Sequence, residues 1–401
     1  MTTTIMPPSS KPFPRLTHLG NMPIKQFLSE YWQKKPLLIR NAFPALPELM
    51  SKDALLTSSL EASVTSRLIE QVRDQKQTSP LNWSLSHGPI TQEQLKQLPD
   101  SHWTLLVQNS DAIEPQVHQL RRAFSFIPSW RMEDIMVSYA SDQGGVGPHF
   151  DYYDVFLIQG EGQRRWRIGQ RADEQSTLVE GQAMKILSDF QTQDEWILQT
   201  GDMLYIPPNI SHWGESIGES TCYSVGFRSL NHGDFLSEYV DSLTYSLDEQ
   251  ARYSDPNIRE QVQPGEITED AIDRLRAILN HYCNDREALA TWFGEYASMS
   301  NNSHNNYTHH PAPIDEEALI NSTKCQLSPL ARAVFYTEQH AEQDVEQESC
   351  LCFVNGFSYP SSLDMAKALS NYEVLIYSDL TDEDQQTLLD LASQDLLVPC
   401  R

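Results

Sequence analysis

The sequence predicts an α+β protein whose central part is an antiparallel β barrel or sandwich. Short runs of alternating apolar and polar residues, separated by turns rich in Gly and Pro, recur between Asp134 and Arg228. After Ser229 the apolar residues change to a helical spacing. Many short strands of this kind are typical of barrels and sandwiches, and not of a parallel α/β sheet.

The first hundred residues are predicted to mix helix with short strands. A helix is expected from Phe27 onwards until Pro36 interrupts it, and the apolar run LLIR, which ends at Arg40, predicts a strand. The run WTLLVQN, residues 103–109, predicts a buried strand.

The central region begins with the alternating run DIMVSYAS at Asp134, followed by a glycine-rich loop over residues 142–148. Further strands are predicted at residues 155–159, 164–168, 195–198, 203–206 and 222–228. A hairpin turn at residues 160–163 is expected to join the first two of these strands.

Three apolar stripes predict helices beyond Ser229. Their members are Leu236, Tyr239, Leu243 and Leu247; Ile272, Leu275, Leu279 and Tyr282; and Leu289, Trp292, Phe293 and Tyr296. A polar stretch over residues 301–313 predicts a linker, and a small α+β unit follows it. The expected domains are therefore residues 1–229, 230–300 and 301–401.

The composition limits the partners and the compartment. The net charge is −26, which disfavours DNA and favours a basic partner. From residue 301 onwards, four Lys and Arg stand against sixteen Asp and Glu. No run of eighteen apolar residues and no secretory signal is present, so no membrane association is expected. Six scattered cysteines without a C-x-x-C pair predict reduced thiols in the cytoplasm.

His149, Asp151 and His212 are the candidate metal ligands. Alternate residues of a strand share a face, so His149 and Asp151 can reach one ion. The stretch from Gly201 to His212, which contains a strand and Pro207-Pro208, is expected to return the second histidine beside them. Two imidazoles and one carboxylate suit Fe(II) and leave three coordination positions open.

Two other residue pairs and one other metal compete with this assignment. Two similar pairs, His232 with Asp234 and His340 with Glu342, lack a comparable third ligand. Zinc is the competing metal for the first set. A zinc hydrolase would need a nearby general base, whereas here a basic strand, RRWR, fits an acidic cosubstrate. Alternation places Arg164 on one face of that strand and Arg165 and Arg167 on the other, but spacing alone does not decide whether any of them binds a carboxylate.

Several long motifs carry a family resemblance. They are YWQKKPLLIRNAF, GGVGPHFDYYDVFLIQGEGQRRWRIG, GDMLYIPPNISHWGES and YSVGFRS. Together they resemble the JmjC-type ribosomal oxygenases of the cupin superfamily, and among these the bacterial arginine hydroxylases of ribosomal proteins. The resemblance is strong from Phe27 to about Ser229.

The resemblance implies a double-stranded β-helix core, a helical dimerisation segment and a winged-helix-like C-terminal domain. It assigns iron to His149, Asp151 and His212, 2-oxoglutarate to Arg164, and a further contact with the cosubstrate to Ser224 in the last core strand. It implies a homodimer that uses dioxygen to hydroxylate the β-carbon of an arginine in a large-subunit ribosomal protein. The chain departs from the general cupin pattern at Ser216, where Asn is common, and in the loop NISH. Both departures bear on the shape of the substrate mouth.

Three other functions stay open at this point. They are hydroxylation of histidine, demethylation of a methylated basic residue, and a non-catalytic cupin that only binds. For an arginine substrate, Asp142, Tyr152, Tyr153 and Asp154 are candidates to hold the guanidinium by charge pairing and stacking. Tyr153 shares a face with Asp151 and is the better stacking candidate, while Asp142 and Asp154 are equally well explained as turn caps.

Overall fold

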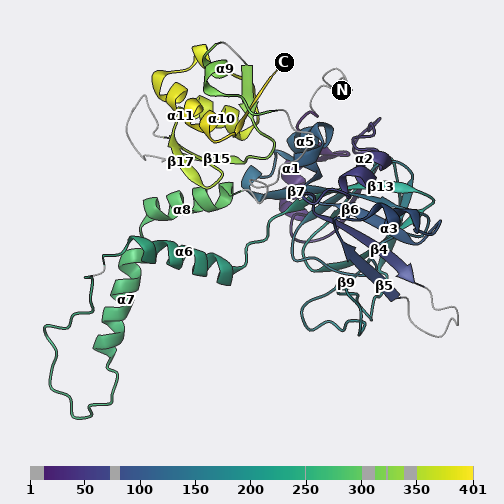
Figure 1. Ribbon diagram of the computed structural model, residues 1–401. Helices are drawn as coiled ribbons and strands as arrows, with labels where there is room; N and C mark the ends of the chain where they lie inside the picture. Colours follow the sequence, from purple (N-terminus) through teal and green to yellow (C-terminus); the bar gives the residue numbers. More distant parts are fainter. Residues whose placement is uncertain are drawn as a thin grey trace. The chain divides into compact units, whose positions relative to one another are not determined.

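The chain forms two compact units in a computed structural model (Figure 1). The structure describes residues 13–72, 82–248, 250–299, 312–321, 324–337 and 350–400. The first unit holds the described residues up to Ser229, and the second holds most of those from Leu230 onwards. The predicted linker at 301–313 lies almost entirely outside the described residues, and the pair His340 and Glu342 lies wholly outside them.

Two antiparallel sheets form the barrel of the first unit, and a short two-stranded sheet, β1-β2 (His18–Leu19 and Met22–Pro23), lies outside it. The larger has eight strands in the order β3-β11-β8-β13-β7-β6-β4-β5. In that order their bounds are Leu37–Ile39, Met203–Ile206, Val155–Gln159, Ser220–Phe227, Met132–Ala140, Trp103–Val107, Ser66–Val72 and Asn82–His87. The smaller sheet has the order β10-β9-β12, with bounds Asp194–Gln199, Gln163–Arg171 and Ile210–Ile217. The strands predicted individually are thus present, and β4, β5 and β12 are additional ones.

The predicted hairpin at residues 160–163 is wrong. β8 pairs with β11 and β13 in the larger sheet, whereas β9 pairs with β10 and β12 in the smaller one. The chain therefore crosses between sheets at Gly160–Gly162. Gly162 has φ +71°, and a Cβ there would lie 2.1 Å from the Glu219 carbonyl oxygen, so the crossing needs a glycine.

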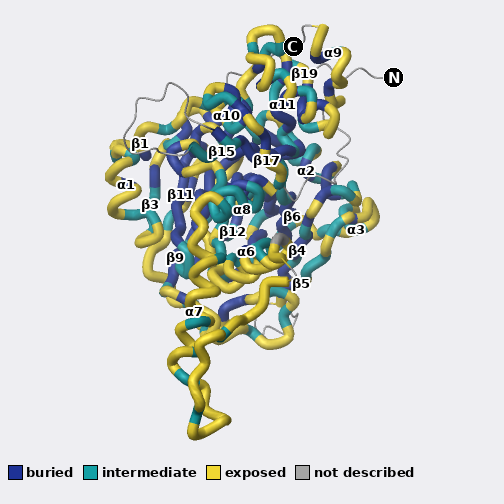
Figure 2. The backbone as a smooth tube through the Cα atoms, turned by 90° about the vertical axis from the view of Figure 1, so that its left-hand side faces the viewer, coloured by how far each residue is buried: buried dark blue, intermediate teal, exposed yellow. Residues whose placement is uncertain are grey.

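The two sheets face each other across a shared core. Val155, Leu157 and Cys222 of the larger sheet pack with Trp166 and Leu198 of the smaller one. The alternate residues of the larger sheet, such as Phe156 and Tyr205, point the other way into a second core beneath the N-terminal helices. Central strands of the larger sheet, such as β8 and β11, are thus buried on both faces, which explains why they read as continuous apolar runs, whereas β9, β10 and β12 keep a partly exposed outer face. Figure 2 shows the buried residues gathered in these strands.

The N-terminal helix differs from its prediction. α1 runs from Ile24–Glu30, beginning after Pro23 and ending well before Pro36. Beyond it, Gln33 adopts φ +58°, its N–H donates to the Tyr205 hydroxyl at 2.7 Å, and its Nε2 donates to Asp154 at 3.0 Å. These tertiary contacts fix a turn where local propensity favoured a continued helix. The predicted strands at LLIR and WTLLVQN are confirmed as β3 and β6.

The remaining helices and short strands of the first unit surround the barrel. They are β1 His18–Leu19, β2 Met22–Pro23, α2 Lys52–Ser58, α3 Gln92–Lys96, α4 Ser110–Ile113 and α5 Pro115–Leu120.

The second unit contains the three predicted helices, α6 His232–Ser246, α7 Glu269–Cys283 and α8 Arg286–Ser298. α6 and α8 pack through aromatic contacts, with the Tyr239 and Trp292 ring centroids 5.0 Å apart. α7 has no buried residue. No helix in the described part of the chain is long and apolar enough to cross a membrane.

Two small sheets and three helices complete the second unit. The sheets have the orders β18-β14-β19 and β15-β16-β17. The bounds are α9 Glu316–Ile320, β14 Lys324–Leu327, β15 Ala333–Thr337, β16 Cys350–Val354, β17 Phe357–Pro360, α10 Leu363–Ser370, β18 Leu375–Ile376, α11 Asp382–Ser393 and β19 Leu397–Pro399.

Candidate metal and cosubstrate site

The three predicted metal ligands meet in the first unit. One ligand atom from each of His149, Asp151 and His212 lies within 4.8 Å of the other two. The Asp151 Oδ2 atom is 3.6 Å from the His212 Nε2 atom and 3.9 Å from the His149 Nε2 atom. Within the described ranges, no other group of three His, Cys, Asp or Glu side chains comes this close. His232 begins α6 and has no such neighbours.

Both imidazoles are oriented by main-chain carbonyl groups. The His149 Nδ1 atom is 2.9 Å from the Gly147 carbonyl oxygen, and the His212 Nδ1 atom is 3.0 Å from that of Ile210. A carbonyl only accepts, so each ring donates from Nδ1 and keeps its Nε2 lone pair for a metal. Burial, and then the neighbouring His149, lower the pKa of His212 to about 4, so its ring is neutral at neutral pH.

The main chain couples the two histidines directly. The His149 N–H donates to the His212 carbonyl at 3.1 Å, and the His212 N–H donates back at 2.8 Å. Asp151 lies just beyond this bridge, outside any strand, and its carbonyl accepts the Asn209 N–H at 2.7 Å. Asn209 has φ +65° in the turn before β12, so the NISH loop holds a conformation usually given to glycine.

Arg164 occupies an unusual position for a cation. It is only 7% exposed, and burial lowers its pKa. Its Nη1 group donates to the Ser138 hydroxyl at 3.0 Å, and its Nε and Nη2 groups donate to the Ser220 hydroxyl at 3.2 and 3.1 Å. No carboxylate in the described part of the chain lies within ion-pair distance of it. A buried, uncompensated guanidinium of this kind fits a bound anion.

The other two arginines of β9 lie on the opposite face, as alternation predicted. Arg165 and Arg167 both pair with Glu195, at 3.4 and 3.1 Å, and Arg167 also pairs with Glu215. These cations are already neutralised at the surface. The choice that spacing left open therefore falls on Arg164.

Ser224 lies on β13 opposite Leu157, and its side chain shares the inner face of the barrel with Cys222. Ser224 is not a hydrogen-bond partner of Arg164. The two serines that accept hydrogen bonds from Arg164 are Ser138 and Ser220, and the sequence analysis did not identify them. Ser138 and Ser220 occupy inward positions of β7 and β13, and counting alternate positions along both strands would have found them.

The predicted substrate-holding residues lie in different places. Asp142 accepts the Gly218 N–H at 2.8 Å, at the end of β12 remote from His212, and this bond lowers its pKa. Asp154 is fully buried and accepts the Tyr205 hydroxyl at 2.6 Å. Tyr153 is 42% exposed, and its hydroxyl end lies beside the metal ligand Asp151.

Asp134 is a partly accessible acid of β7 that the sequence did not single out. It shares the inner face of β7 with Met136 and Ser138, and its Oδ2 atom accepts the Asn109 N–H at 2.9 Å. Burial of its hydroxyl end, followed by the carboxylates of Asp151 and Asp134, raises the pKa of Tyr153, although the residue as a whole is 42% exposed. Burial and the nearby Asp111 raise the pKa of Asp134 itself to about 6.

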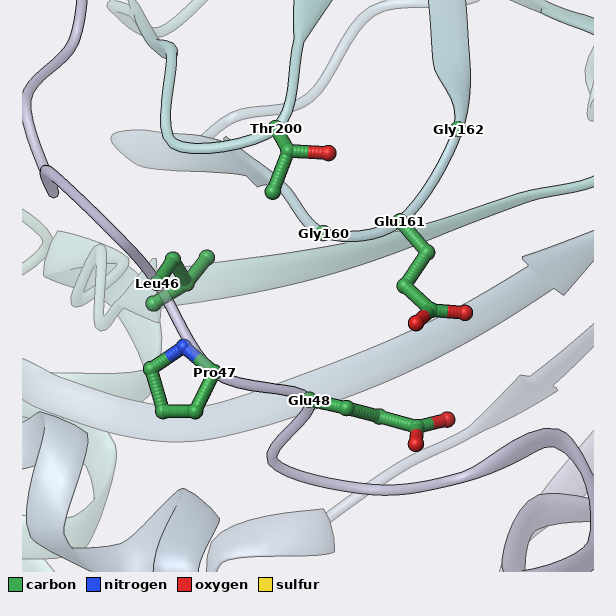
Figure 3. A pocket seen from close by; sticks show the side chains of 7 residues that line it. All are labelled: Leu46, Pro47, Glu48, Gly160, Glu161, Gly162 and Thr200. Carbon is green, nitrogen blue, oxygen red and sulfur yellow. The ribbon is translucent and has the colours of Figure 1, made fainter.

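A cavity of about 390 Å³ lies elsewhere in the first unit (Figure 3). It is lined by Leu46, Pro47, Glu48, Gly160, Glu161, Gly162 and Thr200. No predicted site residue lines it, so it is separate from the cluster of metal ligands.

Known proteins resemble this chain in sequence and in structure. The JmjC domain model matches residues 119–235. The ribosomal protein uL16 3-hydroxylase of Escherichia coli is 34% identical over 274 residues, covering 68% of this chain and 71% of that protein. A probable ribosomal oxygenase of Haemophilus influenzae is 31% identical, covering 67% and 66%. The structure of the Escherichia coli ribosomal oxygenase YcfD with cobalt and 2-oxoglutarate has a TM-score of 0.78 at 27% identity, covering 95% of this chain and 99% of that one.

Proposed function

The chain belongs to the JmjC-domain ribosomal oxygenases, and on this premise we propose that it hydroxylates the β-carbon of an arginine in a large-subunit ribosomal protein, using Fe(II), 2-oxoglutarate and dioxygen. One observation carries the proposal: a cluster of two histidines and an aspartate shares a barrel with the buried, uncompensated Arg164. Bound Fe(II) supplies the redox chemistry by which dioxygen converts 2-oxoglutarate to succinate and carbon dioxide and places one oxygen atom in a C–H bond.

The donor set fits this metal and this cosubstrate. His149, Asp151 and His212 offer two neutral nitrogens and one anionic oxygen, which suits Fe(II). Arg164 offers N–H groups for the distal carboxylate of the 2-oxo acid. Arg164 and its serine partners are buried away from bulk water, which strengthens this charge pairing.

Incubation with ribosomal peptides tests the reaction. Peptides from large-subunit ribosomal proteins, supplied with Fe(II) and 2-oxoglutarate, should gain one oxygen on arginine, and the gain should vanish when that arginine is replaced by lysine. Oxidation confined to histidine would favour a histidine hydroxylase, and loss of a methyl group would favour a demethylase.

We propose that Asp134 and Tyr153 hold the substrate guanidinium. Asp134 is partly accessible, faces inward and lies near the Tyr153 hydroxyl, whereas the Asp142 carboxylate is occupied by the Gly218 N–H. A carboxylate beside an exposed aromatic ring suits a guanidinium, which pairs and stacks at once.

Asp134→Asn should raise the KM for the substrate peptide by about ten- to a hundredfold, because it removes a charge-assisted contact. The KM for 2-oxoglutarate should not change. In the wild type, peptide affinity should fall as the pH drops through about 6, where Asp134 takes up a proton. Asp142→Asn is the matched control, and a larger effect there than at Asp134 would reverse the assignment.

The other two parts of the chain are assigned as a helical dimerisation segment, residues 230–300, and a winged-helix-like domain, residues 301–401. Residues 1–229 form the catalytic domain. Support comes from α7, where Ile272, Leu275 and Leu279 are 47, 48 and 63% exposed. An apolar helix face of this size is typical of a protein interface. The acidic C-terminal part is not expected to bind DNA, since it has few cations with which to displace counterions.

A homodimer is testable by mass. Leu275→Glu combined with Leu279→Glu should convert a dimer to a monomer in light scattering, because it places charge in an apolar interface. Arg276→Glu, a charge change at a 75% exposed side chain of the same helix, is the control and should leave the mass unchanged. A wild-type protein that is monomeric at micromolar concentration would contradict the proposal.

The proposed compartment is the cytoplasm. All six cysteines are free thiols, which fits a reducing environment. The substrate is also a component of the ribosome.

A further inference from the structure

Three serine hydroxyls from three different strands surround the Arg164 side chain. Ser138 comes from β7, Ser216 from β12 and Ser220 from β13, and they are 4, 2 and 1% exposed. Only Ser138 and Ser220 contact the guanidinium. Ser216 lies behind Ser220, with their Oγ atoms 2.7 Å apart.

Each serine hydroxyl has a single hydrogen, and this determines the direction of every hydrogen bond in the chain of hydroxyls. Arginine nitrogens only donate, so Ser220 accepts from Arg164. The Ser216 Oγ atom is 2.6 Å from the Gly218 carbonyl oxygen, which only accepts, so the single Ser216 hydrogen points there. The short contact between the two serines then requires Ser220 to donate to Ser216. All the hydrogens thus point from Arg164 towards Gly218.

Ser216 is held firmly at the end of this chain. Its N–H donates to the Gly144 carbonyl at 3.0 Å, and its own carbonyl accepts the Gln143 N–H at 3.0 Å. These two bonds fix the Ser216 main chain, and the bond to the Gly218 carbonyl orients its hydroxyl group. The Ser216 Oγ atom therefore accepts from Ser220 at a defined position.

We propose that Ser216 is a positioning residue for the cosubstrate: it draws the Ser220 hydrogen away from Arg164, so that Ser220 presents lone pairs and holds the guanidinium in one orientation for the distal carboxylate of 2-oxoglutarate. This role rests on the proposed function. Without the Ser216 hydroxyl, the Ser220 hydrogen loses its acceptor and turns to other directions, some of which oppose a donor from Arg164. Ser216 itself is not a hydrogen-bond partner of Arg164 and acts through Ser220.

Binding to the Co(II)-substituted protein tests this role without turnover. The ligands are 2-oxoglutarate and 2-oxobutyrate, which lacks the distal carboxylate, each titrated by calorimetry. Ser216→Ala should weaken 2-oxoglutarate binding roughly two- to tenfold, the size of one hydrogen bond, and leave 2-oxobutyrate binding unchanged. Ser216→Thr keeps the hydroxyl and should restore most of the affinity. Ser110→Ala, which removes another buried serine hydroxyl that donates to a carbonyl, is the control and should match the wild type.

A double-mutant cycle shows whether Ser216 acts through Ser220. In a Ser220→Ala background, Ser216→Ala should have no further effect on 2-oxoglutarate binding. Additive losses would overturn the positioning role, as would equal losses for both ligands or a loss that Ser216→Thr fails to restore. A wild-type protein with no preference for 2-oxoglutarate over 2-oxobutyrate would refute the proposed function itself. A wild-type preference that Ser216→Ala retains in full would refute only the role of Ser216.

Discussion

Asp151→Ala is expected to abolish 2-oxoglutarate turnover while the fold stays intact. Asp151 supplies the only negative charge among the three clustered ligands, and its Oδ2 atom lies 3.6 and 3.9 Å from the two imidazole Nε2 atoms. Substitutions that merely disturb the support of a ligand cost about ten- to a hundredfold. Loss of the ligand itself should exceed the upper end of that range.

Two measurements check the Asp151 prediction. Succinate release should disappear, and added Fe(II) or Co(II) should no longer raise the Tm, because a protein that does not bind the ion gains no stability from it. The metal-free Tm should change little, since the Asp151 side chain is 23% exposed and the Asn209 N–H bonds to its main chain. Asp173→Ala, at an exposed acid, is the matched control. Full turnover by the Asp151 variant would remove this residue from the metal site.

Arg164→Ala should raise the 2-oxoglutarate concentration needed for half-maximal turnover by about ten- to a hundredfold, the value of a charge-assisted bidentate contact. The same change should not lower the Tm of the ligand-free protein strongly, because it removes a buried charge that has no carboxylate partner. Stabilisation of the protein by 2-oxoglutarate should be lost. A small effect on the stability of the ligand-free protein, together with loss of stabilisation by the ligand, is the mark of a binding residue.

Arg165→Ala is the control for Arg164, since it deletes a neighbouring cation that already pairs with Glu195 on the outer face. Its 2-oxoglutarate requirement should equal that of the wild type. An unchanged requirement in the Arg164 variant, together with a raised one in the Arg165 variant, would place the cosubstrate on the other side of the strand.

Side-chain direction along single strands was the most predictable feature of the site. The alternation of Arg164 and Trp166 against Arg165 and Arg167 follows from backbone geometry alone, and the structure confirms it. The grouping of His149, Asp151 and His212 was also predictable, but the strand expected for the first two is wrong: His149 forms only an isolated bridge to His212, and Asp151 lies in no strand.

Pairing between strands was not predictable in the same way. The predicted hairpin at residues 160–163 had suitable turn residues, but β8 and β9 have inner faces that must meet across the core, so they belong to different sheets. The residues of a turn do not indicate which sheet the following strand will join. The importance of Asp134 and Ser220 has the same origin, because each acquires its neighbours from strands distant in the sequence.

The reciprocal main-chain bonds between His149 and His212 hold the backbones of these two ligands against each other. The conformational entropy of bringing these two residues together is lost when the protein folds. Metal binding therefore does not have to lose it a second time. Asp151 takes no part in this pair of bonds, and its carboxylate is therefore the adjustable member of the set. Divalent ions of different radius should therefore leave both imidazoles in place and differ in the position of the carboxylate. The preference of this protein among divalent metals would then depend on how far the segment that carries Asp151 can shift to match the radius of the ion.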